Sequence, residues 1–227
     1  MFGPRTIDAQ FALAPGESRV ARHALAERLF HWTLAASFLV LIVTAFGPIL
    51  GWKFEWVATH WIAGIVMTLA ILFHLGRALL SLEFWSMMVD RIDLRDLWRG
   101  LVGQLSRRGP LPGKPGKYEL GQKLFHWGIA GVAVGLVATG LLMLAKLDTP
   151  FWQRNPYWLS ETAWGIVYTI HGICATLALP MIIVHVYFVL RPEHVHLLRT
   201  MVTGWETRRE YLEDTDTSRW RPEELKE

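Results

Sequence analysis

The sequence predicts an all-α membrane protein: a four-transmembrane-helix bundle with a cytoplasmic interfacial helix between the second and third spans. The chain is 52% hydrophobic and only 19% charged, which is too apolar a balance for a soluble domain of 227 residues. Four uncharged runs, residues 29–50, 57–76, 124–145 and 162–190, are near or above the roughly 20 residues that a spanning helix needs. They lack the alternation of barrel strands, so helices are the elements that satisfy their backbone in lipid.

The basic residues predict how these spans are oriented. Of the 23 Lys and Arg residues, 20 lie before the first span, between the second and third, or after the fourth, and three lie in the other two connections. Cytoplasmic loops are enriched in Lys and Arg, so both termini are expected in the cytoplasm. The net charge of +3 then reflects topology, and no nucleic-acid partner is expected.

The remaining segments follow from this topology. Residues 1–28 form a cytoplasmic N-terminal segment, residues 29–190 the transmembrane domain, and residues 191–227 a polar cytoplasmic tail. Apolar and charged residues interleave at near-helical spacing over 82–105, which predicts a helix lying on the membrane surface. Residues 106–121 contain several Pro and Gly residues and are expected to form a loop.

Histidines in the spans are the strongest functional signal. His171 and His185 are fourteen residues apart in the fourth span, a separation of about 21 Å that returns to nearly the same side of an α-helix. The predicted topology places His60 at the outer depth of His171. At the inner depth of His185, three histidines compete as its partner: His31, His74 and His126.

Two imidazoles facing each other at each depth suit a haem b held between two histidines. The single cysteine, Cys174, excludes a Cys-ligated iron–sulfur cluster and a covalently attached haem of the CxxCH type. Ionisable residues inside spans are functional candidates by default. We therefore expect His60 and His171 to bind an outer haem, and His185 to bind an inner haem with one of its three candidate partners.

Several stretches resemble the cytochrome b (gamma) subunits of membrane-bound formate dehydrogenases, which are related to the cytochrome b subunits of nickel–iron hydrogenases. The most specific are "RLFHWT", "GKYELGQKLFHW", and the "IH" and "VHVY" pair fourteen residues apart. The resemblance covers all four spans. It implies two haem b groups, the outer one on His60 and His171 and the inner one on His31 and His185, with His74 as the alternative to His31.

The same resemblance implies a quinone site at the start of the third span. The matching residues are Gly121 and Gln122, whereas Glu119 stands where an asparagine is familiar. A carboxylate there has two interpretations: it exchanges protons with the quinone, or it is a solvated group that pairs with Lys117 or Lys123.

The resemblance therefore implies an electron-carrying membrane anchor in the bacterial cytoplasmic (inner) membrane. Its partners are the lipid bilayer, quinone, an outer-face iron–sulfur subunit and a catalytic dehydrogenase subunit, so the chain is not a complete enzyme alone. The alternatives are a hydrogenase cytochrome b subunit, a stand-alone b-type cytochrome that oxidises a small reductant with quinone, and a haem-free transporter or anchor. Because Asp and Glu are absent from the four uncharged runs, a cation pathway is disfavoured.

Overall fold

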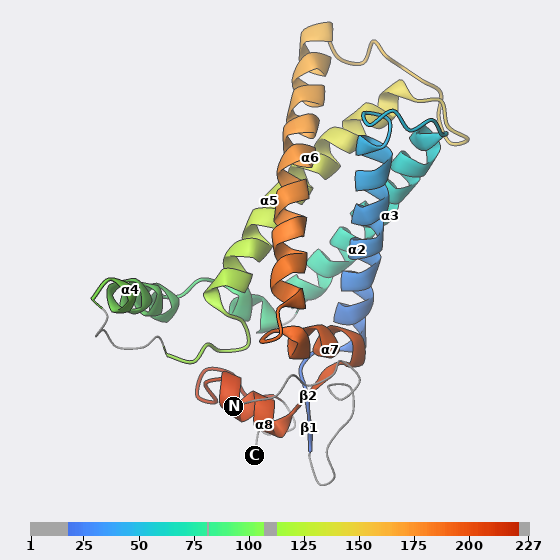
Figure 1. Cartoon of the computed structure of the whole chain (residues 1–227). Coiled ribbons are helices and arrows are strands. Elements are labelled where there is room, and N and C mark those ends of the chain that lie inside the picture. Colours follow the sequence, from blue (N-terminus) through green and yellow to red (C-terminus); the bar gives the residue numbers. More distant parts are fainter. Residues whose placement is uncertain (1–17, 81, 107–112, 223–227) are drawn as a thin grey trace. The chain divides into compact units, whose positions relative to one another are not determined.

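The computed structural model describes residues 18–80, 82–106 and 113–222, which are mostly helical (Figure 1). The described elements are, in chain order, β1 (Arg19–Ala21), α2 (Leu25–Phe46), α3 (Trp56–Leu80), the 3-10 helix η1 (Leu82–Met87), α4 (Arg91–Ser106), α5 (Leu120–Met143), the 3-10 helix η2 (Leu144–Lys146), α6 (Glu161–Leu190), α7 (Val195–Thr203), β2 (Trp205–Thr207) and α8 (Arg208–Asp214). Residues 1–17 of the predicted N-terminal segment, 107–112 of the predicted loop and 223–227 of the tail lie outside the described residues.

The chain divides into two compact units. One, which we call the membrane unit, consists of Leu29–Gly76 and Trp127–His185. The other, the terminal unit, comprises the described residues of Met1–Arg28, Arg77–His126 and Val186–Glu227. The terminal unit thus contains the beginnings of α2 and α5 and the ends of α3 and α6, which means that the four long helices alternate in direction.

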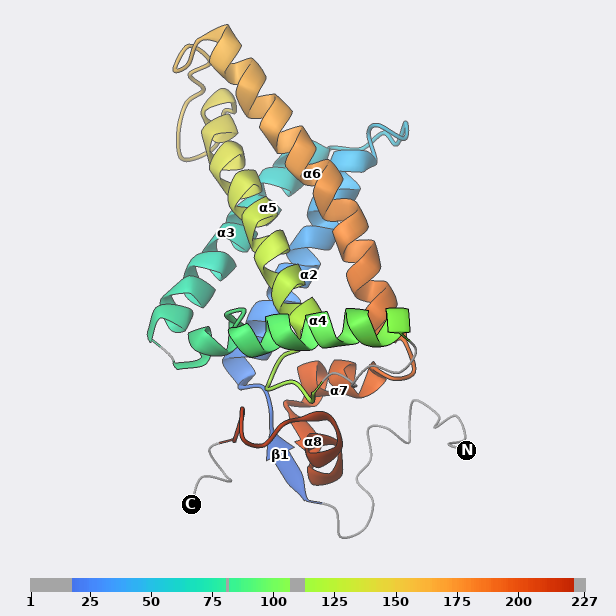
Figure 2. The same cartoon turned by 90° about the vertical axis from the view of Figure 1, so that its left-hand side faces the viewer.

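The membrane unit is a bundle of α2, α3, α5 and α6, which Figures 1 and 2 show as four long helices side by side. All four are long and apolar enough to cross a membrane, which confirms the predicted all-α bundle of four membrane helices. Much of their apolar surface is exposed, for example at Leu39, Leu72 and Ile183. Exposed apolar side chains are what a spanning helix presents to lipid.

The core of the bundle lies at its middle. Its buried residues come from all four helices: Phe38 on α2, Met67 on α3, Ala133 and Leu136 on α5, and Ala178 on α6. Ala178 is seven residues from both His171 and His185, and Met67 is seven residues from both His60 and His74. Seven residues of helix rise about 10 Å, so this apolar core separates the two depths at which the histidines lie.

Helix α5 packs closely on α6 through glycine. A Cβ atom added at Gly135 would lie 2.6 Å from the Cys174 sulfur, and one at Gly128 would lie 3.0 Å from Cε of Met181. Small residues allow membrane helices to approach each other in this way. The only described proline inside α6, Pro180, lies between His171 and His185, and prolines are tolerated in spanning helices.

Local capping moves the helix ends away from the predicted span limits. Helix α6 begins after Ser160, whose hydroxyl accepts a hydrogen bond from the Ala163 amide at 3.3 Å, as a helix N-cap does. Helix α2 ends at Phe46, four residues before the predicted limit. The chain turns there because Gly47 and Pro48 follow, and proline does not continue a helix.

The terminal unit contains a small sheet that the sequence did not predict. Strands β1 and β2 pair antiparallel, with Arg19 opposite Thr207 and Ala21 opposite Trp205. A buried ion pair joins them, because Arg22 donates to Glu206 at 2.9 Å. Helix α8 then begins with a complete capping box between Thr207 and Glu210. The tail therefore folds against the N-terminal segment.

The segment predicted as one helix over 82–105 is divided in two. The 3-10 helix η1 ends at Met87 and α4 begins at Arg91. Asp90 separates them, because its carboxylate accepts hydrogen bonds from the Ile92 and Asp93 amides, each at 2.8 Å. This is N-cap geometry, which starts a new helix.

Candidate functional site

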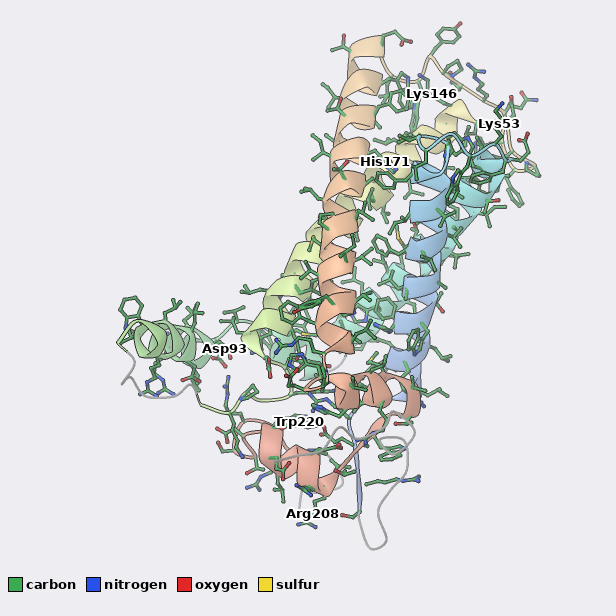
Figure 3. All side chains as sticks on the ribbon, viewed as in Figure 1. Lys53, Asp93, Lys146, His171, Arg208 and Trp220 are labelled. Atoms are coloured by element: carbon green, nitrogen blue, oxygen red, sulfur yellow. The ribbon has the colours of Figure 1, made fainter. Side chains whose placement is uncertain are left out.

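The first site is built by His60 on α3 and His171 on α6. Their ring centroids are 6.4 Å apart and their planes are inclined by 64°. Both side chains are half-buried. Figure 3 labels His171 at the same end of the membrane unit as Lys53 and Lys146, two of the three basic residues that the topology prediction assigned to the outer face.

Each of these imidazoles is held by a threonine from a neighbouring helix. Nδ1 of His60 lies 2.8 Å from the hydroxyl oxygen of Thr44 on α2. Nδ1 of His171 lies 2.8 Å from the hydroxyl oxygen of Thr139 on α5. Both threonines are buried, at 2% and 6% exposure. The site therefore draws one residue from each of the four long helices.

The second site is built by His31 on α2 and His185 on α6. Their ring centroids are also 6.4 Å apart, with an interplanar angle of 53°. His74, one of the two other histidines considered for this site, stacks on Phe30 with ring centroids 4.2 Å apart and planes within 8° of parallel. His126 belongs to the terminal unit.

The separation of both pairs fits an iron held between two imidazoles. An imidazole nitrogen ligates a metal at about 2 Å and the ring centre lies about 1.1 Å behind it, so two imidazoles on opposite sides of one metal have centres about 6.2 Å apart. Both measured separations are 6.4 Å. Two neutral imidazoles are also a pair of nitrogen donors that haem iron accepts. The residues present thus fit a haem b at each pair.

Small residues near the histidines divide into two groups. A Cβ atom added at Gly64 or Gly172 would meet no atom within 4 Å, so both positions border open space beside His60 and His171. Ala178 behaves differently, because it is 2% exposed and belongs to the core of the bundle. The two glycines are therefore not in close contact with a neighbouring helix, whereas Ala178 packs the helices together.

Two residues of the predicted quinone site, Gly121 and Gln122, lie in the first turn of α5, and Glu119 directly precedes that helix. The side-chain oxygen of Gln122 accepts a hydrogen bond from the Glu119 amide at 3.0 Å, which is half of a capping box. The Glu119 side chain is exposed. A Cβ atom at Gly121 would meet nothing within 4 Å.

Lys123, one of the two lysines suggested as partners of Glu119, pairs with Asp93 instead. Its ammonium group lies 2.6 Å from the Asp93 carboxylate and 3.0 Å from the Met88 carbonyl oxygen. Arg219 donates a further bond to Asp93 at 2.8 Å. Burial alone raises the pKa of Asp93, but the hydrogen bonds from Lys123 and Arg219 outweigh it and hold that pKa below its usual value. This network ties the start of α5 to α4 and to the C-terminal segment; Figure 3 labels Asp93.

Thr44 and Thr139 are the site residues that sequence reasoning missed. Inside an apolar run, a threonine is compatible with any helix face. A signal was nevertheless present, because each threonine follows the histidine of an "LFHW" motif by thirteen residues, His31 in one case and His126 in the other.

Comparison with known proteins gives the family. The family model described as prokaryotic cytochrome b561 matches residues 22–204. The "Formate dehydrogenase, cytochrome b556 subunit" of Haemophilus influenzae is 27% identical over 204 residues, covering 84% of this chain and 78% of that protein. The "Formate dehydrogenase, cytochrome b556(fdo) subunit" of Escherichia coli strain K12 is 22% identical over 196 residues, which cover 83% of this chain and 86% of the Escherichia coli protein.

These matches confirm the resemblance to formate dehydrogenase cytochrome b subunits that the sequence motifs indicated. The family match extends from the last residues before α2 to the residue after α7, so it includes all four spans and both histidine pairs. A cytochrome b family implies haem b as the prosthetic group, and the four apolar helices place this group in an integral membrane protein of bacterial type. The chain belongs to the prokaryotic cytochrome b561 family of membrane electron-transfer proteins.

Proposed function

We propose that this chain is the membrane subunit of a formate dehydrogenase-type complex, in which it binds two haem b groups and carries electrons between a dehydrogenase partner and quinone. One observation carries the proposal: two histidine pairs share the same 6.4 Å centroid separation. Both pairs include a residue of α6, and fourteen residues of that helix separate them. In this proposal, a single chain would hold two cofactors at two depths.

His60 and His171 would hold the outer haem, and His31 and His185 the inner one. A haem b with two histidine ligands supplies one-electron transfer and has no open coordination position. The protein's contribution is to fix the four imidazoles on four packed helices. The buried residues Phe38, Met67 and Ala178 lie between the two depths, where they exclude water from the space between the sites.

His31 is favoured over His74 as the inner ligand by its distance from His185. The separation of the His31 and His185 ring centroids is the one that an intervening metal needs. The ring of His74 is instead stacked face to face on Phe30, and that contact occupies one face of the imidazole. In this assignment, His74 packs on the residue that precedes His31.

The beginning of α5 is the proposed place of quinone reduction. The Gln122 side-chain oxygen is used in capping the helix, which leaves its amide N–H groups as donors to a quinone carbonyl. Reduction of quinone to quinol takes two electrons and two protons. The exposed carboxylate of Glu119 is able to pass those protons from water. Gly121 leaves the backbone open beside them.

Orientation and partners complete the proposal. The basic residues predict that residues 1–28 and 191–227 are cytoplasmic, with the transmembrane dihaem domain at 29–190 in the bacterial inner membrane. The names of the relatives indicate other dehydrogenase subunits as partners, and we expect an iron–sulfur subunit at the outer haem. Helix α4 exposes Leu94, Trp98 and Leu101, which supports a position on the membrane surface.

The test is quinone reduction by membranes that contain the complete complex with wild-type chain or single variants. Formate-dependent reduction of a quinone analogue is expected with the wild type and with His74→Ala. It is expected to be lost with His31→Ala and strongly reduced with Gln122→Ala. Activity with hydrogen in place of formate would assign the chain to a hydrogenase. Activity lost in His74→Ala and retained in His31→Ala would contradict the inner ligand assignment.

A further inference from the structure

The two histidines of the outer pair are held in the same way by the two halves of the chain. The first half contains "LFHW" at 29–32, Thr44 on α2 and His60 on α3, and the second contains "LFHW" at 124–127, Thr139 on α5 and His171 on α6. In both halves the threonine lies on the first helix and the histidine on the second. Both Oγ1 to Nδ1 distances are 2.8 Å. The repetition makes these two hydrogen bonds a paired feature of the site.

The direction of both bonds follows from what else the threonines contact. The Thr44 hydroxyl lies 2.7 Å from the Val40 carbonyl oxygen, and the Thr139 hydroxyl lies 2.6 Å from the Gly135 carbonyl oxygen. A carbonyl oxygen only accepts hydrogen bonds, so each hydroxyl donates its single proton to that carbonyl oxygen. Each threonine oxygen must then accept a hydrogen bond from the imidazole. His60 and His171 therefore both carry their proton on Nδ1.

This arrangement leaves Nε2 of both rings without a proton, and an unprotonated nitrogen is what a metal needs. We propose that Thr44 and Thr139 are positioning residues of the outer haem site, which hold both axial imidazoles in the Nδ1–H tautomer and lower the reduction potential of that haem. The inference rests on the proposed haem ligation by His60 and His171. It adds two residues to the site.

The effect on the potential has a defined sign. A hydrogen bond from Nδ1–H to an acceptor raises the basicity of the imidazole, and a more basic axial ligand stabilises the ferric state over the ferrous state. Both rings of the outer pair have such an acceptor. Thr44 is thirteen residues from His31, about 20 Å along α2, so the inner site is too distant to share this acceptor.

The experiment is a redox titration of haem absorbance on the purified full-length chain in lipid nanodiscs. Thr44→Val and Thr139→Val remove the acceptor and keep the shape of the side chain. Each is expected to raise the reduction potential of the outer haem by up to about 59 mV. For one electron, that shift is about a tenfold increase in the ferrous-to-ferric ratio at a given solution potential. The double variant is expected to shift further. The haem missing from His60→Ala identifies which of the two signals is the outer one.

Two controls separate the hydrogen bond from side-chain packing. Thr44→Ser and Thr139→Ser keep the hydroxyl and are expected to keep the wild-type potential. Thr169→Val is the matched control, since Thr169 lies two residues before His171 and its hydroxyl bonds the Gly165 carbonyl oxygen at 2.8 Å, but its side chain is exposed. Its substitution is expected to leave both potentials unchanged.

The remaining outcomes are equally decisive. If the valine variants lose the outer haem and the serine variants retain it, the hydroxyl is needed for ligand positioning and the proposal stands. Equal haem loss in the valine and serine variants overturns it, because the serine variants keep the hydroxyl and the haem would then be lost whether or not the hydrogen-bond acceptor is present. Two bound haems with unchanged potentials in both valine variants also overturn it, while leaving the proposed function intact. A wild-type chain without haem overturns both.

Discussion

Gly135→Ala is expected to weaken the contact between α5 and α6 and to disturb the outer histidine pair. The added Cβ would lie 2.6 Å from the Cys174 sulfur, about 1 Å inside ordinary contact distance. Inserting a methyl group into a packed helix interface costs about 1–3 kcal/mol. The position matters for function as well. The Gly135 carbonyl oxygen accepts a hydrogen bond from the Thr139 hydroxyl, and Cys174 lies three residues after His171.

The same helix supplies a matched control. A Cβ atom at Gly131 would meet no atom within 4 Å. Gly131→Ala should therefore be neutral or stabilise α5 by up to about 1 kcal/mol, the difference in helix propensity between the two residues. Cys174→Ala removes the clashing sulfur, so the double variant Gly135→Ala/Cys174→Ala should recover part of the loss. The coupling between the two positions is expected to be about 1–2 kcal/mol.

The assay is thermal unfolding of the purified chain in one detergent, followed by tryptophan fluorescence, together with the haem content of each variant. A loss of about 2 kcal/mol corresponds to a Tm lowered by roughly 4–8 °C for a chain of this size. The outer haem should be lost at a lower temperature than the inner one. The reasoning is refuted if Gly135→Ala is as stable as Gly131→Ala, or if Cys174→Ala gives no rescue.

Three further predictions concern the terminal unit. Asp93→Asn should destabilise it by about 3 kcal/mol, because the buried Lys123 ammonium loses its carboxylate partner; amide hydrogen exchange across residues 88–94 measures this. The folded-state pKa of Asp93 is lowered. The stability that the Asp93 carboxylate contributes should therefore be complete above the unfolded pKa near 4 and disappear as pH falls through the lower folded value. A free energy of exchange that is independent of pH in this range would contradict this prediction. Thr207→Ala removes the capping box of α8 and should cost about 1 kcal/mol by hydrogen exchange in α8, whereas Thr207→Ser should not.

The four spans were predictable because each depends on a local quantity, the length of an uncharged run. The residues at which the helices begin and end were harder to predict. Helix α2 begins at Leu25, four residues before the uncharged run, because a first turn tolerates Glu27 and Arg28. At the other end of that helix, Gly47 and Pro48 stop it before the hydrophobic signal ends. Hydropathy reports solubility in lipid, whereas capping residues decide where a helix starts and stops.

The sheet of the terminal unit was not predictable from local pattern. Its strands have three residues each, and the partners Arg19 and Thr207 are far apart in sequence, so neither strand has a measurable period. One local signal was available in the tail. The letters "TRRE" at 207–210 form a capping box, and that pattern marks a helix start.

For the candidate site, the sequence predicted the depth of each histidine but not its hydrogen bonds. The spacing of fourteen residues in α6 depends only on helix geometry. The pairing of Thr44 with His60 and of Thr139 with His171 depends on how four helices pack, which no single helix encodes. The choice among His31, His74 and His126 also depends on how the helices pack, because it is the ring centroid of His31 that lies 6.4 Å from that of His185.

The central claim is that four histidines form two haem sites, and the most direct measurement is the haem-to-chain ratio with a reduced-minus-oxidised spectrum. The proposal predicts two haems per wild-type chain. It predicts one haem in each of His31→Ala, His60→Ala, His171→Ala and His185→Ala. The His60 and His171 variants should lose the same spectral component, and the His31 and His185 variants the other. A wild-type chain without haem despite adequate haem supply, or a different grouping of the four variants, would contradict it.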